Sequence, residues 1–170
     1  RVYCFNTFFY SRLTQGPDRF DYEGVRRWTL KAGVDVVDYD LLLVPVNASA
    51  VHWALGVIDM RERRFAFLDS LHGPDGDGVT ATLARWLGAE VASRHGWAHE
   101  AALCLHAWSV GRNAVASVPV PRQRDGGSCG VFVLSMAERL ERGVALAFGQ
   151  RDIPLLRKQM VLDLHDGRLL

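Results

Sequence analysis

The sequence predicts one compact domain, residues 1–170, in which helices surround a central sheet. Residues 52–60 and 63–71 are rich in aromatic and aliphatic side chains and are separated by a polar pair, so they read as two strands of a hairpin. Segments 79–93 and 129–143 have the length and the apolar spacing of helices. With 49% hydrophobic composition and no internal repeat, 170 residues can bury a substantial core.

The segments before the hairpin give weaker signals. Residues 6–13 and 23–29 are expected to be helical or irregular, because Gly16-Pro17 and Gly33 interrupt them. Residues 41–46 form an apolar run that indicates a strand next to the hairpin. With this strand beside the hairpin, the predicted sheet lies at the centre of the domain.

The hairpin brings a base and a carboxylate together. If the turn is centred between Met60 and Arg61, residues whose numbers sum to 121 face each other, and His52 and Asp69 form such a pair. Cross-strand partners have Cβ atoms roughly 4.5–5.5 Å apart, which suits a carboxylate that bonds an imidazole nitrogen and fixes its tautomer. A slip of one residue would put the two side chains on opposite faces.

The second half of the chain contains further expected elements. Residues 73–78, rich in Gly and Asp, predict a loop before the helix over 79–93, in which Leu83, Trp86 and Leu87 have helical spacing. Residues 115–120 predict a strand. A last helix is expected to begin after Asp152 as its cap, with Pro154 in the first turn.

Cys129 stands where a helix begins, directly after the glycine-rich stretch 123–128. Aligned peptide dipoles place about half a positive charge at a helix N-terminus, which favours the thiolate, the nucleophilic form of cysteine. Glycines at 126, 127 and 130 let a substrate chain approach closely. The alternative is a small buried thiol with no chemistry, but the order His52, Asp69, Cys129 supplies a base, its orienting carboxylate and a nucleophile.

Composition excludes several other functions. A net charge of +1 gives no electrostatic footprint for nucleic acid, and residues 61–64 are better explained as a solvated turn. No apolar run reaches the roughly 18 residues of a membrane helix.

Three cysteines without framework spacing indicate a reducing compartment, cytoplasm or nucleus, with Cys4 and Cys104 as packing residues. His and Cys spacing predicts no metal site, and no cofactor is expected.

Seven blocks of this chain resemble the catalytic domain of the ubiquitin-like-protein-specific proteases, the SUMO (sentrin) proteases, in the same order. They cover residues 5–10, 25–29, 40–46, 52–59, 67–71, 123–130 and 157–160. The resemblance implies a papain-like α+β cysteine protease fold with a central mixed or antiparallel sheet flanked by helices. It implies a monomer that cleaves after a Gly-Gly terminus of SUMO, with Cys129 as nucleophile, His52 as base and acid, Asp69 as its orienter and Gln123 as oxyanion donor.

The same resemblance assigns substrate-binding residues. Trp53 would line the narrow channel for the diglycine tail, with Gly127 on the approach to the cysteine, and Phe8 and Arg27 would lie near the bound modifier. The channel role is favoured for Trp53 over that of a core aromatic of the hairpin, whereas Phe8 and Arg27 could equally serve packing or surface ion pairs.

Some positions depart from the family pattern and leave alternatives open. Ser128 precedes the cysteine where the family usually has Asp, Asp125 stands where it has Asn, and Asn47 lies where a histidine is frequent. The domain is also expected to be shortened at its N-terminus relative to the family. Specificity for ubiquitin or another modifier, acetyl transfer on a related fold, and a non-catalytic modifier-binding domain are therefore kept as alternatives.

Overall fold

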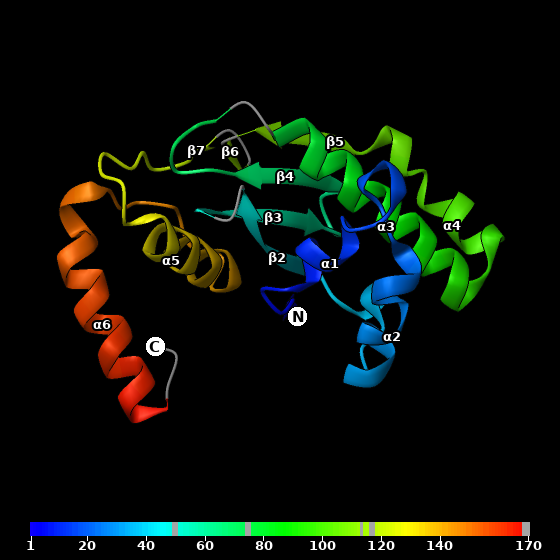
Figure 1. Cartoon of the computed structure of the whole chain (residues 1–170), viewed down its shortest axis with the longest axis horizontal. Helices are drawn as coiled ribbons and strands as arrows, with labels where there is room; N and C mark the ends of the chain where they lie inside the picture. The colour runs from blue at the N-terminus through cyan, green and yellow to red at the C-terminus, as the bar shows by residue number, and fades with distance from the viewer. Residues whose placement is uncertain (49–50, 74–75, 113, 116–117, 168–170) are drawn as a thin grey trace.

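The fold is known from a computed structural model, which describes residues 1–48, 51–73, 76–112, 114–115 and 118–167 (Figure 1). A five-stranded sheet in the order β1-β2-β3-β4-β5 crosses the middle of the molecule. The inner strands are antiparallel, whereas β1 and β5 add in parallel at the two edges, so the sheet is mixed as predicted. The strands are β1 Val2–Cys4, β2 Leu41–Ala48, β3 His52–Asp59, β4 Arg64–Leu68 and β5 Ser109–Arg112.

Helices cover both faces of this sheet, which gives an α+β arrangement (Figure 1). One face carries α1 Phe9–Leu13, α2 Tyr22–Ala32 and α3 Gly76–His95, with α4 Trp97–Leu103 beside α3. The other face carries α5 Cys129–Glu141, followed by α6 Ile153–Asp166. Short 3-10 turns are η1 Pro17–Arg19, η2 Val36–Asp38, η3 Leu105–Ala107 and η4 Gln150–Asp152, and a small second sheet pairs β6 Ala114–Val115 with β7 Val118–Pro119.

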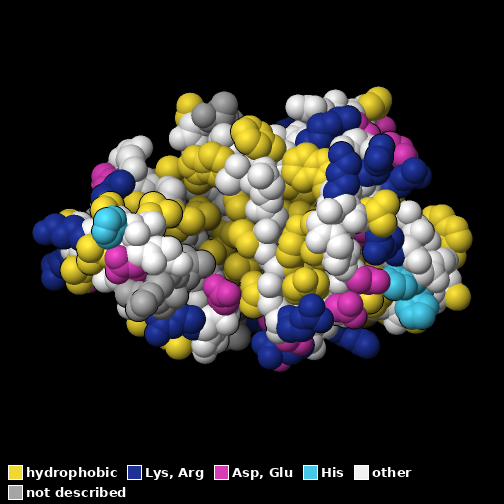
Figure 2. Space-filling view, turned by 90° about the horizontal axis from the view of Figure 1, so that it is seen from below, with side chains coloured by type: hydrophobic (Ala, Val, Ile, Leu, Met, Phe, Trp, Pro, Cys, Tyr) yellow, Lys and Arg dark blue, Asp and Glu magenta, His cyan; other side chains and the backbone are white. Residues whose placement is uncertain are grey.

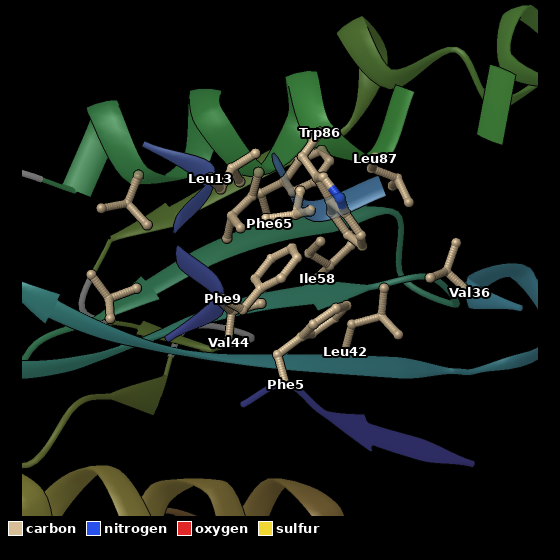
Figure 3. Packing of buried hydrophobic residues seen from close by; sticks show 14 of the residues in the cluster. Phe5, Phe9, Leu13, Val36, Leu42, Val44, Ile58, Phe65, Trp86 and Leu87 are labelled. Carbon is tan, nitrogen blue, oxygen red and sulfur yellow. The ribbon is translucent and has the colours of Figure 1, made fainter. Parts of the chain in front are cut away.

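Alternation along the strands builds a separate apolar core on each face. In β4, Phe65 and Phe67 pack with the first helical layer, whereas Ala66 and Leu68 pack with α5. Figure 3 shows the first core, where Trp86 of α3 lies over the sheet. Its ring makes edge-to-face contacts with Phe9, at 5.1 Å between centroids. The second core contains the apolar face of α5, which places the start of that helix beside the sheet.

Charged side chains keep to the periphery on the face seen in Figure 2. Apolar side chains run across the middle of that face, and Lys, Arg, Asp and Glu surround them. None of the helices in the described ranges combines the length and the apolar character that a membrane crossing requires.

Helix boundaries follow the sequence signals in several places. The carboxylate of Asp21 caps α2 by accepting a 2.9 Å hydrogen bond from the Gly24 N–H, and Gly33 ends the helix with φ of 65°. Gly143, predicted to stop the α5 segment, likewise has φ of 65° two residues after the helix. Asp152 occupies the N-cap position of α6, but its carboxylate accepts the Gly149 N–H instead.

Three expectations about elements were wrong or incomplete. Helix α3 starts at Gly76, inside the predicted loop, while residues 74–75 of that loop lie outside the described residues. The predicted strand over 115–120 is divided between β6 and β7, with residues 116–117 outside the described range. Strand β5 was missed because its four residues lack the aromatic and aliphatic content of a strand and form only by pairing with β4.

The predicted hairpin exists, but its register differs by two residues. Leu55 faces Leu68 and Asp59 faces Arg64, so facing residues sum to 123 rather than 121. The turn contains four residues, and the Asp59 carboxylate stabilises it by accepting the Glu62 N–H at 3.0 Å. An even shift preserves the face on which each side chain lies. His52 and Asp69 are therefore diagonal neighbours at the end of the sheet instead of directly opposed partners.

Candidate active site

His52 and Asp69 meet where β3 begins and β4 ends. The Nε2 atom of His52 lies 2.6 Å from the Oδ1 atom of Asp69. The Asp69 carboxylate is buried, and it also accepts the backbone N–H groups of Leu71 at 2.8 Å and Gly73 at 2.7 Å. An ionised carboxylate only accepts, so Nε2 donates and Nδ1 of His52 is the nitrogen left to act as a base.

The environment of Asp69 favours its charged form. Burial raises the pKa of this carboxyl, but the hydrogen bonds from His52, Leu71 and Gly73 outweigh burial and hold the pKa below its ordinary value. A carboxylate that stays ionised keeps the imidazole in one tautomer and stabilises the imidazolium when it forms.

Gly73 allows the chain to wrap tightly around this carboxylate. A Cβ atom at position 73 would lie only 2.9 Å from Asp69 Oδ2, closer than such atoms normally approach. The loop needs glycine here because its N–H must come within hydrogen-bond distance of the same oxygen. The sequence indicated a loop at Gly73 but not its role.

Cys129 is the first residue of α5 and is buried. The helix starts after Ser128, whose carbonyl accepts the first intrahelical bond from Phe132 at 3.0 Å. The N–H groups of the first turn have no partner within the helix. Helix α5 packs against β3, the strand that opens with His52. The predicted nucleophile thus begins the helix that packs against the strand carrying His52.

Gln123 is buried with both ends of its amide held. Its Oε1 atom accepts the hydroxyl of Ser70 at 2.9 Å, and its Nε2 atom donates to the carbonyl of Asp125 at 2.5 Å. The backbone is tied as well, since the Gln123 N–H donates to the Ser70 carbonyl at 2.8 Å. Ser70 directly follows Asp69, so one short turn positions both the histidine and the amide. Sequence reasoning missed Ser70; its only signal was the position next to the carboxylate.

The loop between Gln123 and Cys129 closes around the Asp125 side chain. Its carboxylate accepts the N–H groups of Gly127 and Ser128 and the hydroxyl of Ser128, at 3.1, 2.9 and 2.7 Å. The Ser128 hydroxyl contributes most to holding the pKa of Asp125 below its ordinary value, followed by the Gly127 N–H. The sequence marked both residues only as departures from the family pattern.

The predicted substrate-binding residues divide between the two sides of the sheet. Trp53 follows His52 on β3 and packs, half-buried, against the core that contains α5, and Gly127 is exposed in the loop before Cys129. Phe8, at the start of α1, and Arg27, on α2, are exposed and belong to the helical layer on the opposite face. The structure therefore places Trp53 next to His52 in β3 and Gly127 in the loop before Cys129, whereas Phe8 and Arg27 lie in the other helical layer.

Metal ligands do not gather anywhere in the described part of the chain: it contains no group of three or more His, Cys, Asp or Glu side chains placed to hold an ion. Cys4, Cys104 and Cys129 are all free thiols, and the first two are exposed.

A mixed sheet between helical layers, a histidine bonded to a buried carboxylate and a cysteine at a helix start are the features expected of a papain-like cysteine protease domain. The family model described as "Ulp1 protease family, C-terminal catalytic domain" matches residues 1–167, and the chain belongs to that family.

Several curated proteins are similar over nearly the whole chain. The putative ubiquitin-like-specific protease 1B of Arabidopsis thaliana is 36% identical over 159 residues, which are 92% of this chain and 44% of that protein. The sentrin-specific protease of Caenorhabditis elegans is 35% identical, with 100% and 22% covered, and human sentrin-specific protease 2 is 32% identical, with 99% and 26% covered. The chain spans less than half the length of these relatives.

Solved structures show the same fold. The Ulp1-like SUMO protease catalytic domain of Chaetomium thermophilum matches with a TM-score of 0.77 and 27% identity, covering 98% of this chain and 61% of that one. The C-terminal Ulp1 protease domain, solved in complex with Smt3, the yeast orthologue of SUMO, matches with a TM-score of 0.71 and 25% identity, covering 92% of this chain and 64% of that one.

Proposed function

We propose that this chain is a SUMO-specific cysteine protease domain that cleaves after a C-terminal Gly-Gly, in modifier precursors and in conjugates on lysine. The observation that carries the proposal is the contact between His52 Nε2 and Asp69 Oδ1 at 2.6 Å, in a chain whose family is the Ulp1 proteases and whose α5 starts at Cys129. This contact directs Nδ1 of the imidazole away from the carboxylate and makes it available to a thiol.

The first half of the reaction forms a thioester. His52 Nδ1 removes the proton of the Cys129 thiol, and the sulfur attacks the carbonyl carbon of the last glycine. The carbonyl electron pair moves to oxygen, and this oxyanion is stabilised by the N–H groups at the start of α5 and by the second Nε2 hydrogen of Gln123. The intermediate then collapses with cleavage of the C–N bond, and the imidazolium gives its proton to the departing amine.

The second half regenerates the enzyme. His52 removes a proton from a water molecule, which attacks the thioester carbonyl, and the same donors stabilise the second oxyanion. Cleavage of the C–S bond releases the Gly-Gly carboxylic acid, and the proton on His52 returns to the thiolate. Asp69 remains ionised throughout and holds the imidazole in place.

Selectivity for glycine follows from the aromatic side chain next to the base. Trp53 adjoins His52 and is held by packing against the α5 core, so it forms a rigid wall. A rigid wall excludes a side chain on the last two substrate residues, while the folded modifier supplies the affinity through a broader surface. A modifier precursor ending in Gly-Ala before the cleavage site should therefore be cleaved much more slowly than one ending in Gly-Gly.

A panel of modifiers with an electrophile at the C-terminus tests the function directly. We expect the chain to be labelled by the SUMO probe at Cys129, and labelling to disappear in Cys129→Ala. Cys4→Ser and Cys104→Ser are the matched controls, since each removes one exposed thiol and should keep full labelling. Preferential labelling by a ubiquitin probe would replace the proposed substrate, and binding of the modifier without any labelling would show a non-catalytic domain.

The location proposed for this protease is the nucleus or cytoplasm. Catalysis requires a reduced Cys129, and three free thiols are compatible with a reducing compartment. Imaging of a tagged chain in cells, with fractionation into cytoplasm and nucleus, tests this placement.

A further inference from the structure

The carboxylate of Asp125 organises the loop that leads into the nucleophile. Its Oδ1 atom accepts two consecutive backbone N–H groups, from Gly127 and Ser128. Its Oδ2 atom accepts the hydroxyl of Ser128 at 2.7 Å and the side-chain amide of Gln150 at 2.6 Å. Four donors therefore converge on one exposed side chain in the residues immediately before Cys129.

The backbone of the same residue holds the other end of the catalytic loop. The carbonyl of Asp125 accepts the Nε2 atom of Gln123 at 2.5 Å. One of the two Nε2 hydrogens is used in this bond, and its direction determines where the second one points. The side chain and the main chain of Asp125 thus connect the amide donor with the turn that presents the sulfur.

The loop needs such bonds because its sequence is flexible. Gly126 and Gly127 follow Asp125, and a Cβ atom at either position would have no neighbour within 4 Å among the residues that the structure describes, so their packing does not restrain them. Adjacent glycines have more conformational freedom than any other pair of residues. Without the carboxylate, this stretch would sample many backbone conformations, and only some of them would place Gln123 and Cys129 productively.

The C-terminal elements form a second anchor on the outer side of the loop. Arg157 of α6 donates to the carbonyl of Gly127 at 3.0 Å. Gln150 of η4 bridges two loop residues, because its Oε1 atom accepts the Arg124 N–H at 2.7 Å while its amide donates to Asp125. Asp125, Gly127, Gln150 and Arg157 line a cavity of about 520 Å³ between the loop and α6. Figure 1 shows α6 beside the segment that enters α5.

We propose that Asp125 is a positioning residue for this hydrolysis, which sets the Gln123 amide and the start of α5 relative to each other, with Ser128, Gln150 and Arg157 as its supports. The proposal rests on the proposed function. Asp125 acts on the oxyanion through Gln123 and the loop, and it contacts neither the histidine nor its carboxylate partner in any described hydrogen bond. Its loss should therefore lower kcat and leave KM nearly unchanged, because the modifier surface is recognised elsewhere.

Steady-state cleavage of a SUMO precursor by the parent, Asp125→Asn and Asp125→Ala separates the possibilities. We expect kcat to fall about 10- to 100-fold in Asp125→Ala. The upper end of this range equals the smallest loss that is typical when an oxyanion donor itself is removed, and KM should stay within about twofold of the parent value. The kcat of Asp125→Asn should lie between that of the parent and that of Asp125→Ala. The amide oxygen of Asn can still accept the two backbone N–H groups, but the amide nitrogen cannot accept the Ser128 hydroxyl or the Gln150 amide. Asp166→Ala, an equal loss of charge at the exposed end of α6, is the matched control and should retain full kcat.

A double-mutant cycle with Gln123→Ala identifies the route of the effect. If Asp125 acts through Gln123, the Asp125→Ala change should cost much less in the Gln123→Ala background than in the parent. A residue that only stabilised the fold would lower the melting temperature and reduce the rate equally in both backgrounds. Thermal unfolding of each variant provides that comparison, and if Asp125→Ala does not fold, the same cycle is run with Asp125→Asn.

The outcomes distinguish this proposal from the proposed function. A parent chain that cleaves no precursor would overturn both. An active parent with unchanged kcat in Asp125→Ala, a loss confined to KM, or equal losses in both backgrounds would overturn the role of Asp125 and leave the proposed function intact.

Discussion

The buried carboxylate of Asp69 receives hydrogen bonds from an imidazole and from two backbone N–H groups of the following turn. Each of these donors favours the ionised form, and together they fix which nitrogen of His52 carries the proton. Ser70, the next residue, orients the amide of Gln123 through its hydroxyl. Two consecutive side chains thus determine the tautomer of His52 and the direction of the Gln123 amide.

At this scale, Asp69→Asn is expected to reverse the tautomer while preserving the shape of the site. An amide can donate to Nε2 and thereby stabilises the imidazole with its proton on Nδ1, where it cannot accept from a thiol. The corresponding change in serine triads lowers kcat by about 10⁴, and we expect at least about 100-fold here. Cleavage kinetics of a SUMO precursor measure this, and a rate equal to the parent's would refute the assignment of Asp69 and His52.

The lowered pKa of Asp69 also predicts a pH dependence of stability. The folded pKa lies below the value of 3.8 in the unfolded chain, so the ionised carboxylate contributes stability above that value. This contribution is lost as pH falls through the folded pKa. The melting temperature of the parent should therefore drop more steeply than that of Asp69→Asn as the pH is lowered below about 4. Parallel curves for the two proteins in thermal denaturation would contradict the prediction.

At the scale of elements, the helical layer opposite α5 is joined by a buried acid. Glu90 of α3 is buried, and it accepts the hydroxyl of Thr29 at 2.6 Å and that of Tyr22 at 3.0 Å, both from α2. Desolvation and the nearby Glu90 raise the pKa of Tyr22 to about 12, so the phenol remains a donor at all physiological pH values. These two bonds tie α2 to α3.

Removing one donor should be more harmful than removing the donor and the acceptor together. Thr29→Val leaves a buried oxygen of Glu90 without its closest donor, which costs about 1–3 kcal/mol of the free energy of unfolding. In the Glu90→Leu background, Thr29→Val should cost almost no further free energy of unfolding. The carboxylate is already absent there, so removing the Thr29 hydroxyl leaves no buried acceptor without a donor. Denaturant unfolding of the four proteins checks this, and additive losses would show that the bond contributes little.

At the scale of the whole molecule, the sheet separates two cores with different consequences for activity. Trp86 fills the core under α1 to α3 (Figure 3), whereas Phe132 of α5 lies in the core next to the site and contacts Phe148, with 5.4 Å between ring centroids. Phe132 is three residues after Cys129, so its packing determines where the start of α5 lies. Trp86 has no such connection to Cys129.

Truncation of either aromatic should destabilise the domain, but only one should alter the chemistry. Both Trp86→Ala and Phe132→Ala are expected to cost about 3–5 kcal/mol in unfolding free energy. At a temperature where both variants are folded, Trp86→Ala should keep a kcat near that of the parent, and Phe132→Ala should lose much of it. Active-site titration with a modifier probe normalises the rates to folded enzyme; equal kcat values in the two variants would show that the cores are not functionally separate.

The family comparisons and the structure confirm the fold that the sequence predicts, a mixed sheet between helices, because alternating and helical apolar patterns encode which side of each element is buried. The start of α5 at Cys129 and the end of α2 at Gly33 could also be predicted from the local sequence, because helix starts and glycine stops depend on neighbouring residues. The roles of Cys129, His52, Asp69 and Gln123 remain predictions that the experiments above address.

Other features were decided only in three dimensions. Turn length, not strand pattern, sets hairpin register, so the pairing of Leu55 with Leu68 was missed by two residues, although alternation still kept His52 and Asp69 on one face. Strand β5 forms because it pairs in parallel with the free edge of β4. Gln150 and Arg157 reach the loop before Cys129 only because η4 and α6 pack beside that loop. Local sequence determined the elements and the side chains available for chemistry. Contacts between residues distant in the chain determined which nitrogen of His52 faces Asp69 and how the loop before Cys129 is held, because these depend on distances that no local pattern specifies.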